Sequence, residues 1–232
     1  MPRPISHQPR SRAQAAVVTL LVASAWLAPT HPVAAQATGV IQGRVQLEAP
    51  PPRRRSANRY PGGSAETHAI QSLPAVAYLV GPINAGQGAD SEARAVMTQR
   101  DTTFVPSVVF LRAGGSVSFP NDDPFQHNVY SYSSIGTFDL GRQNPGSSAS
   151  KTFAEPGILE VFCEVHDFMR GTIVVSENPY GAIVGADGSF RIAGVPAGEY
   201  TIAFWQSEHE PLQQTVTVTG GGTATVQVQL RR

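Results

Sequence analysis

Residues 157–171 read Gly-Ile-Leu-Glu-Val-Phe-Cys-Glu-Val-His-Asp-Phe-Met-Arg-Gly and are the most informative segment of the chain. Every second residue from Leu159 to Cys163 is apolar, and this period of two predicts a strand with one buried face. The chain then continues as Cys-x2-His-x2-Met. We therefore expect Cys163, His166 and Met169 to share one short loop at the end of a strand.

A further histidine, His127, lies 36 residues before Cys163 in the run Phe-Gln-His-Asn-Val-Tyr. The four side chains offer one thiolate, two imidazoles and one thioether. Thiolate and thioether favour Cu(I), imidazole serves both oxidation states, and a trigonal His2Cys site with a long axial Met is the blue copper arrangement. The residues therefore predict one copper ion, bound strongly by His127, Cys163 and His166 and weakly by Met169. Zinc tolerates Cys and His, but Met is a poor zinc ligand.

Residue counts exclude several related kinds of site. The chain has one cysteine, whereas a binuclear purple copper centre needs two. Four of the six histidines lie after residue 35, which is too few for the trinuclear cluster of a multicopper oxidase. Three strong ligands and a Met leave no open position for a substrate, so we expect no enzyme activity. His68 and His209 match no motif and are expected to be ordinary surface or core residues.

Several pieces upstream of the Cys-x2-His-x2-Met loop stand in a characteristic order. They occupy residues 104–108, 114–119, 119–123, 127–129 and 153–157. Together with the loop they resemble the cupredoxins, the type 1 blue copper proteins of the plastocyanin and azurin group. The loop spacing is most similar to that of amicyanin. The resemblance covers about residues 95–176 and implies a Greek-key β-sandwich that carries single electrons.

The same resemblance implies roles for residues around the predicted copper. Asn128 matches the asparagine that ties the two ligand loops together by hydrogen bonds. The ring edge of His166 would be the electron exit, within an apolar patch to which Pro124, Phe125 and Phe168 could contribute. A redox protein, such as a cytochrome or a periplasmic dehydrogenase or oxidase, would dock there through a small and weak interface.

The first 35 residues have the pattern of a secretory signal peptide. Residues 1–12 carry three Arg and no acid, an apolar run covers about residues 13–28, and small residues at 33–35 suit cleavage before Gln36. The run is shorter than the ~20 apolar residues that a membrane span needs. We therefore expect a bacterial periplasmic or secreted protein of 197 residues, with 14 basic and 17 acidic side chains and no membrane span. A lone cysteine in such an oxidising compartment suggests a task for its thiol.

Short runs with a period of two recur through the rest of the chain, separated by Gly, Pro, Asn and Asp. Many short strands of this kind predict an all-β fold built from sandwiches or barrels. A weak helical pattern covers residues 91–97. The Pro- and Arg-rich residues 50–55 and the Gly-rich residues 81–90 predict loops.

Residues 177–232 differ in character from the copper segment. Ala-Asp-Gly-Ser-Phe-Arg-Ile at 186–192 suits a strand that follows a tight Asp-Gly turn. Pro-Ala-Gly-Glu-Tyr at 196–200 begins another strand, with its Tyr expected at a corner. These motifs resemble the carboxypeptidase regulatory-like domains, also called transthyretin-like, which implies a small Ig-like or transthyretin-like β-sandwich without a catalytic group of its own.

The motifs suggest a division of the chain. We expect a signal peptide (1–35), N-terminal strands and loops (36–94), a cupredoxin domain (95–176) and a regulatory-like β-sandwich (177–232). Residues 41–45 and 76–79 resemble the beginning of a regulatory-like domain although they precede the copper segment. One hypothesis is that the cupredoxin unit is inserted into the regulatory-like sandwich between Leu79 and Tyr180. The alternative assigns residues 39–81 to the edge of the cupredoxin sheet.

The charge balance argues against nucleic acid as a partner. The chain has 17 Lys and Arg against 17 Asp and Glu, and phosphate contacts need a basic surface. The interpretation that follows is a periplasmic blue copper protein that carries single electrons. Two alternatives stay open, namely a copper-binding or copper-delivery protein without electron transfer, and a non-redox surface-binding β-sandwich module.

Overall fold

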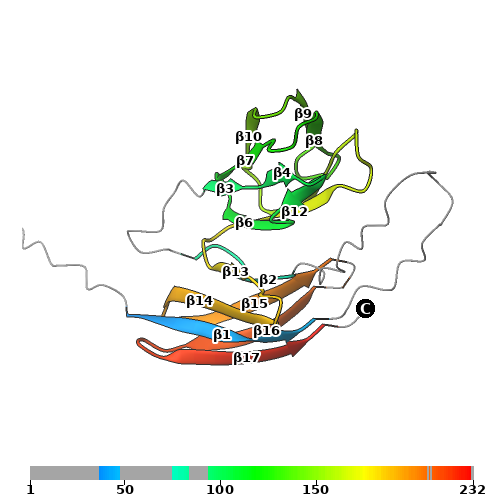
Figure 1. Cartoon of the computed structure of the whole chain (residues 1–232). Helices are drawn as coiled ribbons and strands as arrows, with labels where there is room; N and C mark the ends of the chain where they lie inside the picture. Colours follow the sequence, from blue (N-terminus) through cyan, green and yellow to red (C-terminus); the bar gives the residue numbers. More distant parts are fainter. Residues whose placement is uncertain (1–36, 48–74, 84–93, 208, 210, 231–232) are drawn as a thin grey trace, which may run out of the picture. The chain divides into compact units, whose positions relative to one another are not determined.

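The computed structural model describes residues 37–47, 75–83, 94–207, 209 and 211–230. These residues form seventeen strands and no helix, so the prediction of an all-β fold is confirmed (Figure 1). The strands are β1 (Thr38–Gln46), β2 (Ala75–Leu79), β3 (Arg94–Val96), β4 (Thr98–Arg100), β5 (Thr103–Val105), β6 (Val108–Arg112), β7 (Ser116–Pro120), β8 (His127–Ser131), β9 (Phe138–Gln143), β10 (Ser148–Thr152), β11 (Gly157–Phe162), β12 (Arg170–Ser176), β13 (Gly181–Ile183), β14 (Ser189–Pro196), β15 (Gly198–Gln206), β16 (Leu212–Val218) and β17 (Thr223–Gln229). Across the described ranges, the structure contains no helical segment with the length and apolarity of a membrane span.

Strands β3 to β12 form one sandwich, which we call the first sandwich. Its sheets have the orders β10-β7-β3 and β6-β12-β11-β8-β9, and β4 and β5 form a small hairpin. Side chains with a period of two fill the space between the sheets, because alternate residues of a strand point to the same face. Val117 and Phe119 of β7 share this core with Leu159 and Val161 of β11, and Cys163 lies in the same cluster. The start of β8 and the loop between β11 and β12 carry the predicted copper ligands.

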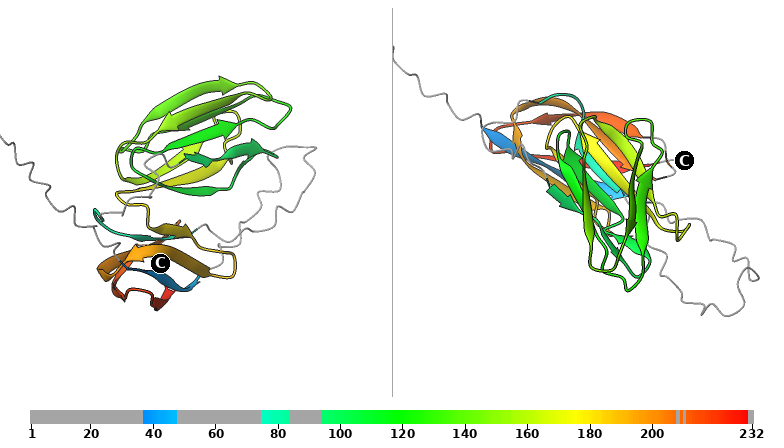
Figure 2. Two further views of the ribbon diagram at one scale, coloured as in Figure 1. Left: turned by 90° about the vertical axis from the view of Figure 1, so that its left-hand side faces the viewer. Right: turned by 90° about the horizontal axis from the view of Figure 1, so that it is seen from above.

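The second sandwich combines strands from both ends of the described chain. Its sheets have the orders β14-β1-β17 and β13-β2-β15-β16. Strand β1 runs antiparallel to β14 and parallel to β17, and Figures 1 and 2 show this blue strand among the orange and red ones. The core includes Ile41, Val45, Phe190, Ile202 and Phe204. The two sandwiches therefore have separate apolar cores.

The order of the strands in the chain bears on how the two sandwiches are connected. Strands β1 and β2 precede the first sandwich in sequence, yet β1 pairs with β14 and β2 pairs with β13 and β15. This is the pairing expected if the first sandwich is an insertion into the second. A third small cluster of buried residues, Val76, Val108 and Val174, contains members of both groups of strands.

Two local predictions in the second sandwich are confirmed. Gly188 has a φ of +81° after Asp187, as a tight Asp-Gly turn requires. The hydroxyl of Tyr200 donates a 2.9 Å hydrogen bond to the carbonyl of Pro196, which fixes the corner at the start of β15. Both features lie where the chain crosses between the two sheets, the first between β13 and β14 and the second between β14 and β15.

The helical pattern predicted for residues 91–97 is wrong where the structure describes it. Residues 94–96 form β3, which pairs in parallel with residues 116–118 of β7. The amide of Met97 donates to the carbonyl of Ser118, and its side chain is buried in the core. Pairing with β7 thus outweighs a weak local preference. The loop predicted at 50–55 and residues 84–90 of the loop predicted at 81–90 lie outside the described residues.

Candidate metal centre

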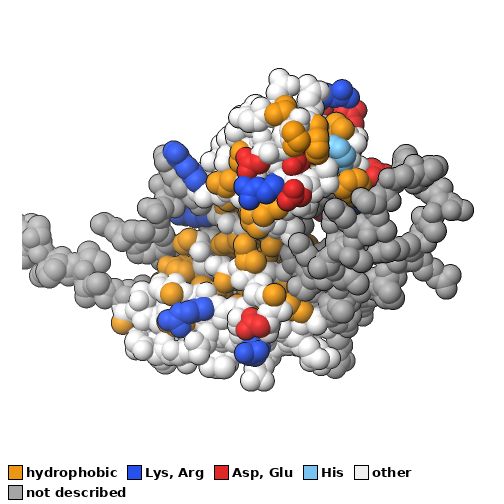
Figure 3. Space-filling model, in the orientation of Figure 1, with side chains coloured by type: hydrophobic (Ala, Val, Ile, Leu, Met, Phe, Trp, Pro, Cys, Tyr) orange, Lys and Arg blue, Asp and Glu red, His pale blue; other side chains and the backbone are white. Residues whose placement is uncertain are grey.

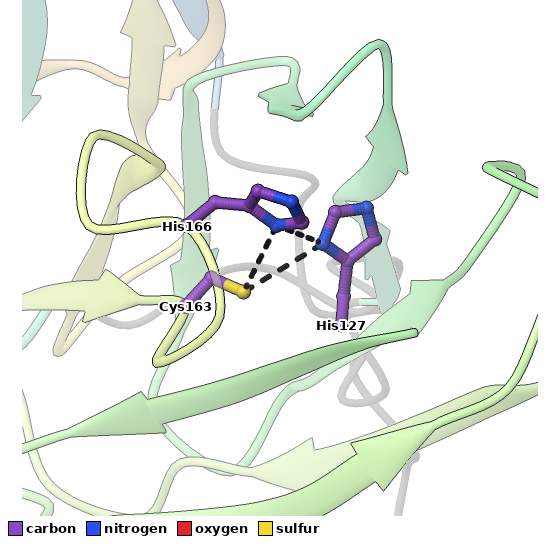
Figure 4. Close-up of side chains that lie close together, drawn as sticks. All are labelled: His127, Cys163 and His166. Atoms are coloured by element: carbon purple, nitrogen blue, oxygen red, sulfur yellow. Dashed lines mark hydrogen bonds between the residues drawn. The ribbon is translucent and has the colours of Figure 1, made fainter. Parts of the chain in front are cut away.

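Three of the predicted ligands lie together at one end of the first sandwich. His127 is the first residue of β8, Cys163 directly follows β11, and His166 lies in the loop before β12. Cys163 Sγ is 3.6 Å from His127 Nδ1 and 3.9 Å from His166 Nδ1, and the two Nδ1 atoms are 3.0 Å apart. Figure 4 shows the three side chains pointing toward one another. Three donor atoms therefore converge on one small volume.

The cluster has the burial and the chemistry of a metal site. The side chains of His127 and Cys163 are almost fully buried, and His166 is partly exposed. Among the described residues, these three form the group of His, Cys, Asp and Glu side chains whose donor atoms lie within 4.8 Å of one another. One thiol and two imidazoles form a soft donor set that suits copper. The residues present therefore fit a copper ion.

Met169 lies in the interior next to this cluster. Its side chain is 1% exposed and belongs to the same apolar core as Cys163. Its amide donates a 3.0 Å hydrogen bond to the carbonyl of His166, which forms a tight turn. The turn directs Met169 inward and leaves His166 nearer the surface.

Asn128 connects the two segments that carry the cluster. Its Oδ1 accepts a 2.6 Å hydrogen bond from the amide of Glu164, the residue after Cys163. Asn128 is 2% exposed. A buried bond of this kind holds the start of β8 and the end of β11 at a fixed separation.

Asp123 contacts the cluster from the loop after β7, and the sequence analysis assigned it no role. Its Oδ2 lies 2.7 Å from His127 Nε2, the ring nitrogen that faces away from Cys163. Burial raises the pKa of Asp123, but hydrogen bonds from Thr102, His127 and Asp101 outweigh burial and lower the pKa below its ordinary value. The carboxyl is therefore ionised beside a buried imidazole.

The rim of the cluster is apolar and aromatic. The Phe125 and Phe168 rings are 42% and 56% exposed, and their centroids lie 5.5 and 5.9 Å from that of His166. Val165 and Pro124 are also exposed. Burial, together with the neighbouring His127, lowers the pKa of His166. Figure 3 shows a histidine surface beside hydrophobic side chains on this part of the molecule.

Of the two histidines that match no motif, the structure describes His209, which does not belong to the cluster. His209 is buried in the second sandwich, and its Nδ1 donates a 2.9 Å hydrogen bond to the carbonyl of Ser207. A core position is one of the two ordinary roles, surface or core, that were expected for this histidine. His68 lies outside the described residues.

A buried polar network that includes the segment before His127 was not predicted from the sequence. Asn121 Nδ2 donates to the carbonyls of Phe125 and Gln143, and Gln99 Nε2 donates to Gln143 Oε1. Gln99 and Gln143 lie in strands and belong to no motif, so their burial could not be anticipated, whereas Asn121 lies within residues 119–123. The position of Asp123, four residues before the predicted ligand His127, is the sequence feature that could have indicated this contact.

Comparisons with known proteins agree with the two predicted resemblances, to the cupredoxins and to the regulatory-like domains. The family described as "Carboxypeptidase regulatory-like domain" matches residues 170–231. Chloroplastic plastocyanin of Physcomitrium patens is 34% identical over 84 residues, which cover 32% of this chain and 50% of plastocyanin. The chain thus spans about half the length of this curated relative. Both predicted resemblances are confirmed.

Solved structures also match the chain. A purple cupredoxin from Nitrosopumilus maritimus is 23% identical, with a TM-score of 0.33, over 35% of this chain and 99% of that one. A reduced amicyanin variant is 26% identical, with a TM-score of 0.34, over 43% and 98%. A copper-containing nitrite reductase from Thermus scotoductus is 25% identical, with a TM-score of 0.36, over 42% and 26%.

Proposed function

We propose that this chain is an exported blue copper protein that carries single electrons through one type 1 copper. His127, Cys163 and His166 would bind the ion strongly and Met169 weakly. The observation that carries the proposal is the convergence of one Sγ and two Nδ1 atoms in a buried site. When bound, copper supplies a one-electron Cu(II)/Cu(I) couple.

The residues of the chain hold the ligand geometry constant. His127 is fixed at the start of β8, and the Asn128–Glu164 bond joins its segment to the Cys163 loop. Loss of the thiol proton on metal binding would leave Cys163 as a thiolate. Because the ligands lie in a closely packed interior, few atoms need to move when the oxidation state changes. A small rearrangement favours rapid electron transfer.

The rim around His166 supports a redox protein as the partner. His166 is the ligand that reaches the surface, and the exposed rings of Phe125 and Phe168 flank it. An exposed apolar rim around a partly buried group is typical of an interaction surface. A cytochrome or a periplasmic dehydrogenase or oxidase would dock there through a small, weak contact.

Export and domain division are part of the same proposal. Residues 1–35 would be removed as a signal peptide, which leaves a periplasmic or secreted chain that begins at Gln36. Residues 95–176 would form the cupredoxin domain and residues 177–232 the regulatory-like one, together with strands β1 and β2. The test is the mass of the protein recovered from the periplasmic fraction of a bacterial host, which should correspond to a chain that begins at Gln36.

The decisive experiment is the visible spectrum and the copper content of the purified protein. We expect about one copper per chain and an intense visible band from thiolate-to-Cu(II) charge transfer, which a reductant bleaches reversibly. Cys163→Ala should abolish the band, because it removes the thiolate. His209→Ala is the matched control, because His209 is a buried histidine of the second sandwich, and the band should persist.

The same experiment separates the alternatives. Stoichiometric copper that lacks reversible bleaching would favour a copper-binding or delivery protein and contradict the electron-transfer proposal. A colourless protein without stoichiometric copper would contradict the copper site itself and favour a non-redox binding module.

A further inference from the structure

The β4–β5 hairpin has an unusual turn that faces the buried carboxylate of Asp123, the residue that contacts His127. The two turn residues, Asp101 and Thr102, have φ angles of +52° and +54°. Positive φ at both central positions is typical of type I′ turns, where Asn-Gly is preferred. A β-branched residue such as Thr102 rarely adopts this conformation, because its side chain crowds the backbone at positive φ. The surroundings must therefore hold the turn in place.

The turn directs two backbone amides at one carboxylate. The amide of Asp101 donates to Asp123 Oδ1 at 2.7 Å, and the amide of Thr102 donates to Asp123 Oδ2 at 3.0 Å. Asp123 Oδ2 also faces His127 Nε2 at 2.7 Å, and the carboxyl residue is 5% exposed. Three donors thus hold one buried carboxylate between the hairpin and the first predicted ligand.

Neighbouring bonds fix the hairpin to the loop that carries Asp123. The amide of Asp122 donates to the carbonyl of Gln99 in the hairpin, whereas the ion pair between the side chains of Arg100 and Asp122 is exposed to solvent and adds little. The amide of Asp123 donates to Asn121 Oδ1. Bonds within the protein therefore determine the position of the carboxylate.

The carboxylate determines which nitrogen of His127 carries the proton. Both oxygens of Asp123 already accept a backbone amide, so the short contact between Oδ2 and His127 is made by an Nε2–H donor. In a neutral imidazole the other nitrogen, Nδ1, then holds the lone pair. Nδ1 is the atom that faces Cys163 and His166. The contacts thus direct the lone pair of the neutral ring toward the other two predicted ligands.

We propose that the Asp101–Thr102 turn and Asp123 form a positioning device that presets the His127 tautomer and lowers the reduction potential of the site. The inference deepens the proposed copper function and rests on it for the potential. A fixed negative charge beside a ligand favours Cu(II) over Cu(I). A partner that hydrogen-bonds a ligating histidine also raises the basicity of the ligand. Asp123 is a positioning residue, because it acts through His127.

The experiment compares three variants of the full-length protein. Asp123→Asn keeps the shape and removes the charge, Asp123→Glu keeps the charge, and Asp122→Asn removes an exposed charge next to it. We expect Asp123→Asn to weaken Cu(II) binding by about 10- to 100-fold. Cu(I) binding should weaken less, so the midpoint potential should rise. Each tenfold change in the ratio of the Cu(II) and Cu(I) dissociation constants corresponds to about 59 mV. Asp123→Glu should restore part of the shift, and Asp122→Asn should stay close to the wild type.

A second measurement uses metal-free wild-type protein and is independent of copper. Imidazole nitrogen NMR signals of His127, identified by their loss in His127→Gln, should show the Nε2–H tautomer at about pH 8, above the ordinary histidine pKa. The Nδ1–H tautomer would overturn the proposal, even if Asp123→Asn fails to fold. Equal potentials for the Asp123→Asn and Asp122→Asn variants would also overturn it. Wild-type protein without copper colour would instead contradict the proposed function.

Discussion

The two sandwiches share an all-β architecture but differ in what they bury. The core of the second sandwich is made of aliphatic and aromatic side chains such as Ile41, Ile202 and Phe204. The core of the first sandwich includes Cys163 and Met169, and buried His127 and Asp123 lie beside them. Both cores consist of buried side chains, so the difference is one of chemistry.

Buried polar groups in the two sandwiches are satisfied in different ways. Asn178, near the end of the second sandwich, donates to the carbonyls of Leu79 and Gly81 and accepts from the amide of Tyr180. It is a structural residue that fastens neighbouring chain segments. The donor atoms of His127, Cys163 and His166 face one another instead, although burying polar groups carries a cost. The candidate metal centre therefore differs from Asn178 in that its buried donor atoms face one another and do not connect chain segments.

The largest expected effect comes from removing one large core side chain in each sandwich. Phe119→Ala and Phe204→Ala should each reduce the free energy of unfolding by about 3–5 kcal/mol, because both rings are fully buried. Chemical denaturation of the metal-free protein measures the loss. Phe204→Ala should keep the copper band below its unfolding transition, since Phe204 lies in the second core. Loss of the band in the folded protein would show that the site depends on both cores.

Copper should stabilise one sandwich more than the other. A ligand at 100 times its dissociation constant stabilises the folded state by about 2.7 kcal/mol, which slows globally protected amide exchange by about 100-fold. We expect this slowing in β8, β11 and β12, which surround the cluster. Hydrogen exchange with and without copper measures it strand by strand. Equal slowing in β1 and β14 would mean that the two sandwiches unfold as one unit.

Sequence reasoning predicted the parts of the molecule that depend on local pattern. The alternation from Leu159 to Cys163 indicated a strand with one buried face, and both residues are 1% exposed. The Cys-x2-His spacing placed two donors on one loop, and they lie 3.9 Å apart in the structure. The turn at Gly188 and the corner at Tyr200 likewise follow from short motifs. Each of these features is determined within a few residues.

Features that depend on distant partners could not be derived from the sequence. A weak local pattern predicts a helix at residues 91–97, but residues 94–96 form β3. Its pairing partner, β7, lies about twenty residues further on, so the local pattern does not reveal the pairing. The bond between Asp123 and the strained Asp101–Thr102 turn needs a hairpin to approach a loop from another sheet. Gln99 and Gln143 are buried together although neither belongs to a motif. Pairing between distant segments determines these positions, and the local patterns of a single sequence do not reveal that pairing.

A matched pair of asparagine variants sharpens the comparison further. Asn128→Ala leaves the Glu164 amide without its partner and Asn178→Ala leaves the Leu79 and Gly81 carbonyls without theirs, so each should cost about 1–3 kcal/mol of stability. Asn128→Ala should also weaken copper binding by about tenfold or more, because it frees the ligand loops. Competition titration with a copper chelator measures this affinity. An equal loss of affinity in Asn178→Ala would refute the local role of Asn128.

The smallest expected effect concerns alkaline pH and the second sandwich. Burial raises the pKa of Tyr78, Tyr180 and Tyr200, so the folded state favours their neutral forms. This stabilisation is complete below the ordinary tyrosine pKa of about 10 and is lost as the pH rises through the raised values in the folded state. Denaturation midpoints measured from pH 8 to 11 should therefore fall at the alkaline end.

Tyr200→Phe tests the contribution of one of these hydroxyls. At neutral pH the variant should be less stable by about 0.5–1.5 kcal/mol, because it loses the bond to the Pro196 carbonyl. It should lose less stability than the wild type above pH 10, so the two curves should converge. Tyr132→Phe is the control, because Tyr132 of the first sandwich is 78% exposed and its removal should leave the curve unchanged. Parallel curves for Tyr200→Phe and the wild type would mean that the alkaline loss arises elsewhere in the molecule.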